Sequence, residues 1–176
     1  VIGQAPACDP INFSLSTPAV QCSGVAGSPY PIAVTLGANP NYSVKVPATS
    51  GALTVTARDA TVSANPKTKI YGNPNPVLDA TVIGQAPGCD VINYTLSTAA
   101  VLCSGVAGSP YPITVTLGAN PNYSVKVPAT SGALTVTARD ATVSANAKTK
   151  VYGDPNPVLD ATVVGQAPAC DPINFT

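Results

Sequence analysis

The sequence predicts an all-β fold made of tandem immunoglobulin-like β-sandwiches, and three observations support this prediction. Apolar and polar residues alternate at period two, as in Ile32–Leu36 and Tyr42–Val46, and no segment shows the periodicity of a helix. Turn-forming runs such as Gly37–Asn41 separate the alternating segments. The whole pattern returns after 81 residues, and the two copies differ at ten of 81 positions. About seven short strands are expected in each repeat, as in a small sandwich.

The boundaries of the repeat are predicted from a change in the alternation. Apolar residues occupy odd positions in Gly51–Ala57 and even positions in Ala60–Ala64, so one strand ends and another begins at Arg58 and Asp59. The same change recurs at Arg139 and Asp140. A junction of one or two residues, without a flexible linker, predicts little bending between repeats. The predicted parts are the C-terminal part of a repeat (1–57), a complete repeat (58–138) and the N-terminal part of a repeat (139–176).

Neither incomplete repeat is expected to bury a core alone, yet each contains what the other lacks. Two interpretations follow. Either the sequence is a segment of a longer repetitive chain, or separate subunits complete each other head to tail by strand exchange. The first interpretation is favoured because it needs no special mechanism. Both interpretations predict a filament, because a head-to-tail contact that does not close into a ring propagates.

Five cysteines follow the repeat, with a spacing of 14 within each copy: Cys8, Cys22, Cys89, Cys103 and Cys170. We expect the local disulfides Cys8–Cys22 and Cys89–Cys103, each worth about 3 kcal/mol, with pairing between adjacent repeats as the alternative. Cys170 is expected to pair with a cysteine beyond Thr176. A zinc site is the rival interpretation, but no CxxC pair and no His are present. Disulfides indicate an oxidising compartment.

Composition argues against several classes of function. Eight basic and eight acidic residues balance, and the basic residues are spread along the chain, so nucleic-acid binding is not expected. No apolar run is long enough to span a membrane. The chain has no His and no Glu, so the usual general bases are missing and neither enzymatic activity nor a cofactor is predicted. Asp59 and Asp140 are expected to form ion pairs or turn caps beside their arginines, and one Asp per junction is too few for calcium.

A Tyr-Gly turn followed by two prolines is the most distinctive segment, and Lys69–Leu78 returns as Lys150–Leu159. Proline fixes one backbone angle and restricts the residue before it, so the turn is expected to be stiff. Each tyrosine is expected to hold its turn against the sandwich. The turn-motif residues are Tyr71, Gly72, Pro74, Pro76, Tyr152, Gly153, Pro155 and Pro157.

The segment Ile70–Leu78 resembles the MBG domain of the YGX type. Further matches follow in the order of the family, in Gly108–Val115, Asn122–Val125 and Gly132–Val136. The resemblance covers the whole repeat and implies a β-rich repeat of a secreted or cell-surface bacterial protein, in many cases an adhesin stalk. The cysteine pair departs from the usual pattern of the family, which has no catalytic residues to carry over.

These observations predict a non-enzymatic structural protein, an extracellular filament or cell-surface stalk stiffened by short junctions and disulfides. Its expected partners are further copies of the same repeat, in the same chain or head to tail. The alternative is an adhesin module that binds host or matrix glycan through a tyrosine surface. Core packing is the favoured role for most tyrosines, namely Tyr30, Tyr42, Tyr94, Tyr111 and Tyr123.

Overall fold

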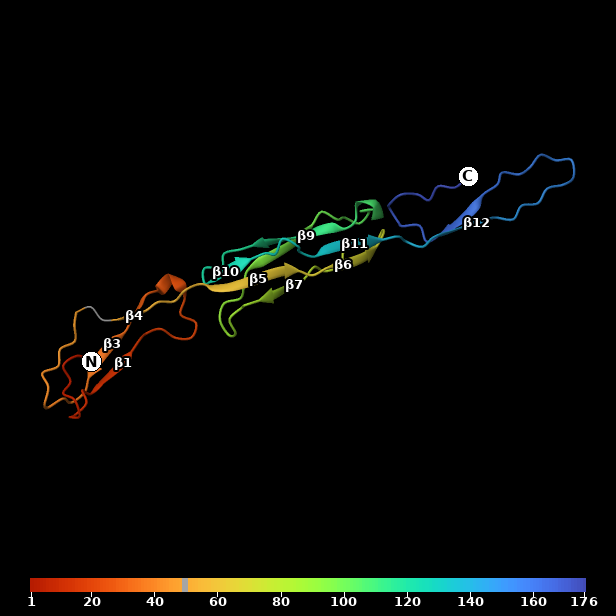
Figure 1. The fold of residues 1–176 in the computed structure, drawn as a ribbon. Helices are drawn as coiled ribbons and strands as arrows, with labels where there is room; N and C mark the ends of the chain where they lie inside the picture. Colours follow the sequence, from red (N-terminus) through yellow and green to blue (C-terminus); the bar gives the residue numbers. More distant parts are fainter. Residues whose placement is uncertain (49–50) are drawn as a thin grey trace. The chain divides into compact units, whose positions relative to one another are not determined.

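The computed structural model describes residues 1–48 and 51–176, which form thirteen β-strands and two short 3-10 turns (Figure 1). The all-β prediction is confirmed. Within the described residues, no helix is long and apolar enough to cross a membrane. The chain forms two compact units, each made of several segments. The first unit contains Val1–Ala60, Ile83–Asn93 and Gly118–Lys126, and the second contains Thr61–Val82, Tyr94–Leu117 and Val127–Thr176.

The segment predicted as a complete repeat contains seven strands in two sheets, in line with the expected number. The four-stranded sheet has the order β6 (Lys67–Ile70), β11 (Ala133–Thr137), β9 (Tyr111–Leu117) and β8 (Tyr94–Thr98). The three-stranded sheet has the order β10 (Tyr123–Lys126), β5 (Arg58–Ala64) and β7 (Ala80–Ile83). A 3-10 turn, η2 (Val106–Gly108), precedes β9.

Pairing between β6 and β11 joins two distant parts of the sequence. The two strands are parallel, with Leu134 opposite Lys67 and Val136 opposite Lys69. β9 pairs antiparallel with both β11 and β8. The contact between residues 64–71 and 132–137 continues past the strands, because Gly132 N donates to Ala64 O at 2.9 Å and Tyr71 N donates to Thr137 O at 2.9 Å.

The core of the second unit is small. Ala64, Ala100, Ile113 and Leu134 are buried together, and Ile113 and Leu134 are the largest of these side chains. Partly buried residues pack around them, namely Leu78, Leu96, Tyr111 and Val115. In so short a β-unit, the burial of these side chains contributes a large share of the stability.

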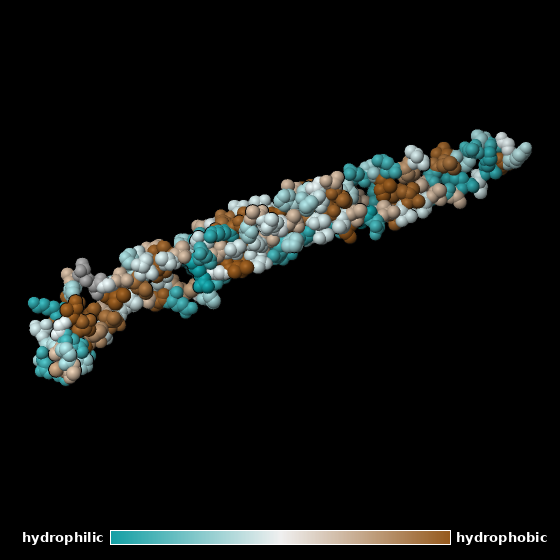
Figure 2. Space-filling model, viewed as in Figure 1, coloured by the Kyte–Doolittle hydropathy of each residue, from teal (hydrophilic) through white to brown (hydrophobic). Residues whose placement is uncertain are grey.

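The incomplete repeats form fewer strands. In the first unit, β1 (Phe13–Ser16) pairs antiparallel with β3 (Ala33–Leu36), β2 (Tyr30–Pro31) pairs with β4 (Ala52–Leu53), and η1 (Val25–Gly27) lies between β1 and β2. In the second unit, β12 (Thr142–Ala145) pairs antiparallel with β13 (Ala161–Val164). Figure 2 shows hydrophobic side chains at the surface over β1 and β3 and over β12.

Two expectations about these segments are wrong. Tyr42–Val46 is not a strand, although Tyr42–Lys45 has the same sequence as β10. β10 pairs with β5, whereas residues 42–45 pair with no strand in the described part of the chain. The junctions are also longer than one or two residues, because residues 54–57 separate β4 from β5 and residues 138–141 separate β11 from β12. The division into 1–57, 58–138 and 139–176 stays a prediction.

We expect Leu134→Ala to lower the free energy of unfolding by about 2–5 kcal/mol, because it leaves a cavity in a small core. Leu53→Ala is the matched control, since Leu53 occupies the same place in the repeat but is 42% exposed against 0% for Leu134. Its expected cost is about 1 kcal/mol or less. Urea unfolding of both variants checks the difference, and equal costs would contradict this assignment of the core.

Candidate functional site: the junction between repeats

The disulfides join successive copies of the repeat. Cys22 pairs with Cys89 and Cys103 pairs with Cys170, each pair 67 residues apart in sequence with a Cα–Cα distance of 5.5 Å. The predicted local pairs Cys8–Cys22 and Cys89–Cys103 are therefore wrong, and the alternative of pairing between adjacent repeats is correct. Cys170 has its partner within the chain, and Cys8 is an exposed free thiol.

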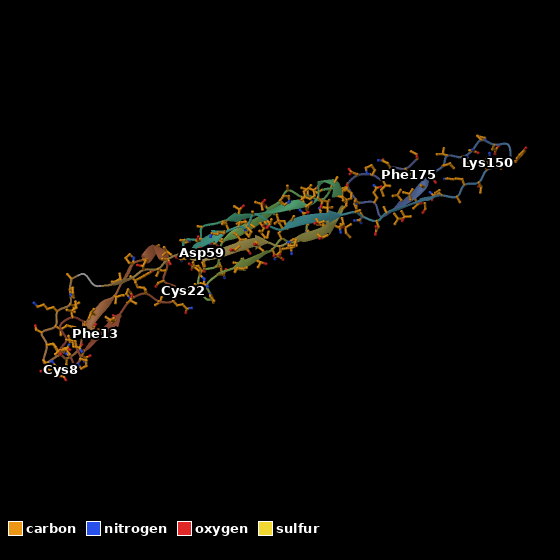
Figure 3. The ribbon with its side chains drawn as sticks, viewed as in Figure 1. Cys8, Phe13, Cys22, Asp59, Lys150 and Phe175 are labelled. Atoms are coloured by element: carbon orange, nitrogen blue, oxygen red, sulfur yellow. A yellow bond between two sulfur atoms is a disulfide. The ribbon has the colours of Figure 1, made fainter. Side chains whose placement is uncertain are left out.

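The strands explain why the local pairs do not form. β1 lies between Cys8 and Cys22, and β8 lies between Cys89 and Cys103. An extended strand advances about 3.3 Å per residue, so it carries its flanking loops apart, beyond the distance that a disulfide tolerates. Figure 3 shows Cys8 at a distance from Cys22.

The arginines of the predicted junction bind backbone carbonyl groups. Arg58 Nε donates to Gly84 O at 2.7 Å, and Arg139 Nε donates to Gly165 O at 2.8 Å. Neither Asp59 nor Asp140 is in an ion pair within the described part of the chain. Each arginine therefore holds a glycine that follows a strand and lies 26 residues later in the sequence. This hydrogen bond takes the place of the expected ion pair with the neighbouring aspartate.

The first turn motif is held by residues of the following repeat. Tyr71 Oη donates to Asp171 Oδ2 at 3.0 Å and accepts from Asp171 N at 3.2 Å. Arg139 Nη1 donates to Asn73 Oδ1 at 3.1 Å. The sequence predicted that Tyr71 holds the turn against its own sandwich, whereas the tyrosine binds the loop that follows β13.

Close packing accompanies these hydrogen bonds. Gly72 has a φ of 79°, a left-handed conformation that L side chains rarely adopt. A Cβ at this position would collide with the Cβ of Ala167, which is 3% exposed. Gly72 is therefore required both by the backbone conformation and by the approach of Ala167. Pro76 is half-buried and Pro74 is exposed.

The second turn motif has the same sequence pattern but no such partners among the described residues. Tyr152 is fully exposed, whereas the other six tyrosines are buried or half-buried. Gly153 has a φ of 90° and open space where a Cβ would lie. Pro155 and Pro157 are exposed. Burial of the motif therefore depends on a following repeat.

A buried lysine positions the loop that carries Cys103. Lys69 is 5% exposed, and its Nζ donates to the carbonyl groups of Val101 at 2.5 Å and Leu102 at 3.3 Å. Asn75 Nδ2 donates to Ala100 O at 2.5 Å. Sequence reasoning missed this lysine, because nothing in the polar alternation of Lys67–Ile70 marks one position as buried.

An ion pair recurs in both copies and was also missed. Lys67 Nζ lies 2.6 Å from Asp79 Oδ2, and Lys148 Nζ lies 2.7 Å from Asp160 Oδ2. The hydrogen bond from Lys67, followed by one from Asn65, holds the pKa of Asp79 below its ordinary value of 3.8. Lys148 lowers the pKa of Asp160 in the same way. The recurrence of Lys and Asp at one spacing was the signal available in the sequence.

Comparison with known families gives a match for one segment of the chain. Residues 60–140 match the family model of the MBG domain (YGX type), so this segment is an MBG domain and the resemblance is confirmed. No curated protein and no solved structure matches the chain significantly. The MBG domain and the two disulfides fit an extracellular or surface-associated repeat protein. Within the described residues, no group of three or more potential ligands could hold a metal ion.

We expect Gly72→Ala to lower the melting temperature more than Gly153→Ala. Both substitutions force alanine into a positive φ, at a cost of about 1 kcal/mol, but only the one at Gly72 also displaces Ala167. Differential scanning fluorimetry of the two variants checks the order. Equal shifts would show that the turn does not pack against the loop of the following repeat.

The lowered pKa of Asp79 predicts a small loss of stability in acid. The ionised carboxylate is favoured in the fold, so its contribution is complete above the ordinary pKa of 3.8 and disappears as the pH falls through the lowered value. Lys67→Met should bring the pKa of Asp79 back toward 3.8, as followed by carboxyl NMR titration, while Asp160 stays unchanged as the internal control. An unchanged Asp79 titration would contradict the role of Lys67.

Proposed function

We propose that this protein is a load-bearing structural component of an extracellular filament or cell-surface stalk, built from tandem immunoglobulin-like sandwiches. Its partners are further copies of the same repeat, in the same chain or head to tail. The observation that carries the proposal is the pairing of Cys22 with Cys89 and of Cys103 with Cys170, which links successive repeats by a bond other than the backbone.

This pairing changes how tension passes along the chain. Pulling at the ends transmits force through the backbone to Cys22, across the sulfur–sulfur bond to Cys89, and through the backbone to Cys103. In each 81-residue period the disulfide bypasses 67 residues of backbone. The tension is then carried only by the 14 residues of backbone from Cys89 to Cys103. A local disulfide would have bypassed only the short loop.

The disulfide bypass limits how far the chain can be extended, and it keeps the chain joined after a cut in the bypassed backbone. A fully extended chain spans about 3.4 Å per residue, so each bypassed segment would add roughly 220 Å if released. The load-bearing segment spans about 50 Å by the same measure. A single cut in the bypassed backbone would also leave the two sides joined by the disulfide. Both properties suit a protein exposed to tension and proteases outside the cell.

Catalysis is not part of the proposal. Asp79 and Asp160 are exposed, paired with lysines, and have lowered pKa values. A general acid or base that works near neutral pH needs a raised carboxyl pKa. These aspartates therefore favour a structural role.

Single-molecule force spectroscopy on the oxidised chain, anchored through terminal tags, tests the proposal. We expect that adding a reductant releases two new increments of about 220 Å of contour length each. Local pairing would instead release increments of about 50 Å.

The double variant Cys103→Ser/Cys170→Ser is the matched control. It retains the Cys22–Cys89 bond, so reduction should release one large increment instead of two. Full extension of the oxidised parent chain before any reductant is added would overturn the load-bearing role.

A further inference from the structure

Five Asn-X-Ser/Thr motifs recur with the repeat, and neither the fold nor the proposed function accounts for them. This motif is the acceptor for Asn-linked glycosylation in secreted proteins, provided that X is not proline. The repeat divides the motifs into two sets, the first at Asn12, Asn93 and Asn174, and the second at Asn41 and Asn122. Asn93 and Asn122, which represent the two sets in the middle of the chain, have different surroundings.

The first set presents both of its polar side chains to solvent. Asn93 and Thr95 are exposed, and Tyr94 between them is half-buried. Residues i and i+2 of an extended segment lie on the same face. The carboxamide of Asn93 and the hydroxyl group of Thr95 are therefore accessible from one side, as an enzyme that recognises both groups requires.

The backbone at Asn93 is fixed, while its side chain remains available. Asn93 N donates to Asn120 Oδ1 at 2.7 Å, and Gly118 N donates to Asn93 O at 3.0 Å. Asn93 Nδ2 donates to Ala119 O at 3.1 Å. An asparagine amide has two N–H groups, and glycosylation replaces one of them. The hydrogen bond to Ala119 can therefore persist in a glycosylated chain.

The second set is used by the fold. Asn122 is half-buried, its Nδ2 donates to Asp90 Oδ2 at 2.6 Å, and its Oδ1 accepts from Val25 N at 2.9 Å. A Cβ on Gly24 would lie 3.2 Å from Asn122 Nδ2, so the backbone of Gly24 packs closely against this carboxamide. A sugar bonded to Asn122 would compete with Gly24 for the same space.

We propose that Asn93 is the acceptor of an Asn-linked oligosaccharide and that Asn122 is not. The donor is an oligosaccharide linked to a polyprenyl diphosphate, and a separate transferase of the secretory membrane catalyses the transfer. The bond between the anomeric carbon and the diphosphate oxygen breaks, and this carbon bonds to Asn93 Nδ2. The polyprenyl diphosphate leaves with the electron pair, and one proton leaves the amide nitrogen.

The choice of Asn93 does not depend on whether transfer precedes folding. Transfer to the folded repeat reaches the exposed Asn93 and not the carboxamide packed against Gly24. Transfer to Asn122 before folding would prevent its contacts with Gly24 and Val25. In either order, the folded protein carries the oligosaccharide at Asn93.

A glycan at Asn93 would also cover an unprotected sheet edge. β8 begins directly after Asn93 and is an edge strand of the four-stranded sheet. An open edge can pair with another chain, and charged residues or prolines commonly prevent this pairing. β8 has neither, whereas β6 contains two lysines, β10 contains one, and β7 directly follows Asp79. A bulky hydrophilic group therefore adds most protection at β8.

Peptide mass spectrometry of the protein secreted by the cells that produce it tests the inference. Cleavage by chymotrypsin after Leu117 places Asn93 and Asn122 on different peptides. We expect an added oligosaccharide mass that electron-transfer fragmentation localises to Asn93, together with an unmodified Asn122. An unmodified Asn93, or a glycan at Asn122 in as large a fraction of the molecules, would overturn the inference.

The hydroxyl group of Thr95 supplies a second readout, in variants expressed in the same cells. Thr95→Ala should abolish the glycan at Asn93, and Thr95→Ser should retain it because the motif is kept. Ser124→Ala is the matched control, since it removes the second motif at an equally exposed position and should leave the glycan at Asn93 unchanged.

Analysis of the cell extract as well as the secreted protein covers a variant that is secreted poorly. A glycan that persists at Asn93 in Thr95→Ala would contradict transfer to the Asn-X-Ser/Thr motif. The inference requires secretion but not load bearing. The pulling experiment follows the disulfides alone, so failure of one proposal is distinguishable from failure of the other.

Discussion

Parallel pairing between β6 and β11 is the contact on which the complete repeat depends. It places residues 67–70 beside residues 133–137, and the hydrogen bonds of Gly132 and Tyr71 extend it at both ends. Leu134 can then lie against Ala64 and Ile113. Residues 148–151 have no pairing strand among the described residues and form no strand, although their sequence differs from that of β6 only in Val for Ile. Strand formation in this chain follows from pairing more than from local propensity.

The same pairing positions the junction with the following repeat. Lys69 lies on β6 and binds the carbonyl groups of Val101 and Leu102, directly before Cys103. Tyr71 follows the strand and binds Asp171, directly after Cys170. The core, the disulfide and the turn motif are therefore coupled. A rearrangement of β6 would disturb all three.

The incorrect predictions have a common cause, because the sequence pattern does not show how far apart two residues lie in space. A spacing of 14 between cysteines is compatible with a local loop, but the strand between them separates their side chains. The Tyr-Gly-Pro pattern marked a stiff turn at Tyr71, yet the partner of this tyrosine lies 100 residues away. Nothing in the sequence indicated that Lys69 is buried, because a lysine in a polar strand is ordinarily exposed.

The sequence alone determined the all-β class, the 81-residue period and the resemblance to the MBG domain, because alternation, turn residues and repetition are local or periodic properties. Only the tertiary structure decided which cysteines pair, which arginine and tyrosine contacts close the junction, and which copies of an identical segment become strands. The physical reason is that a strand, a disulfide and a buried lysine each need a partner. That partner is brought near by the fold, and the sequence of the segment itself does not specify where it lies.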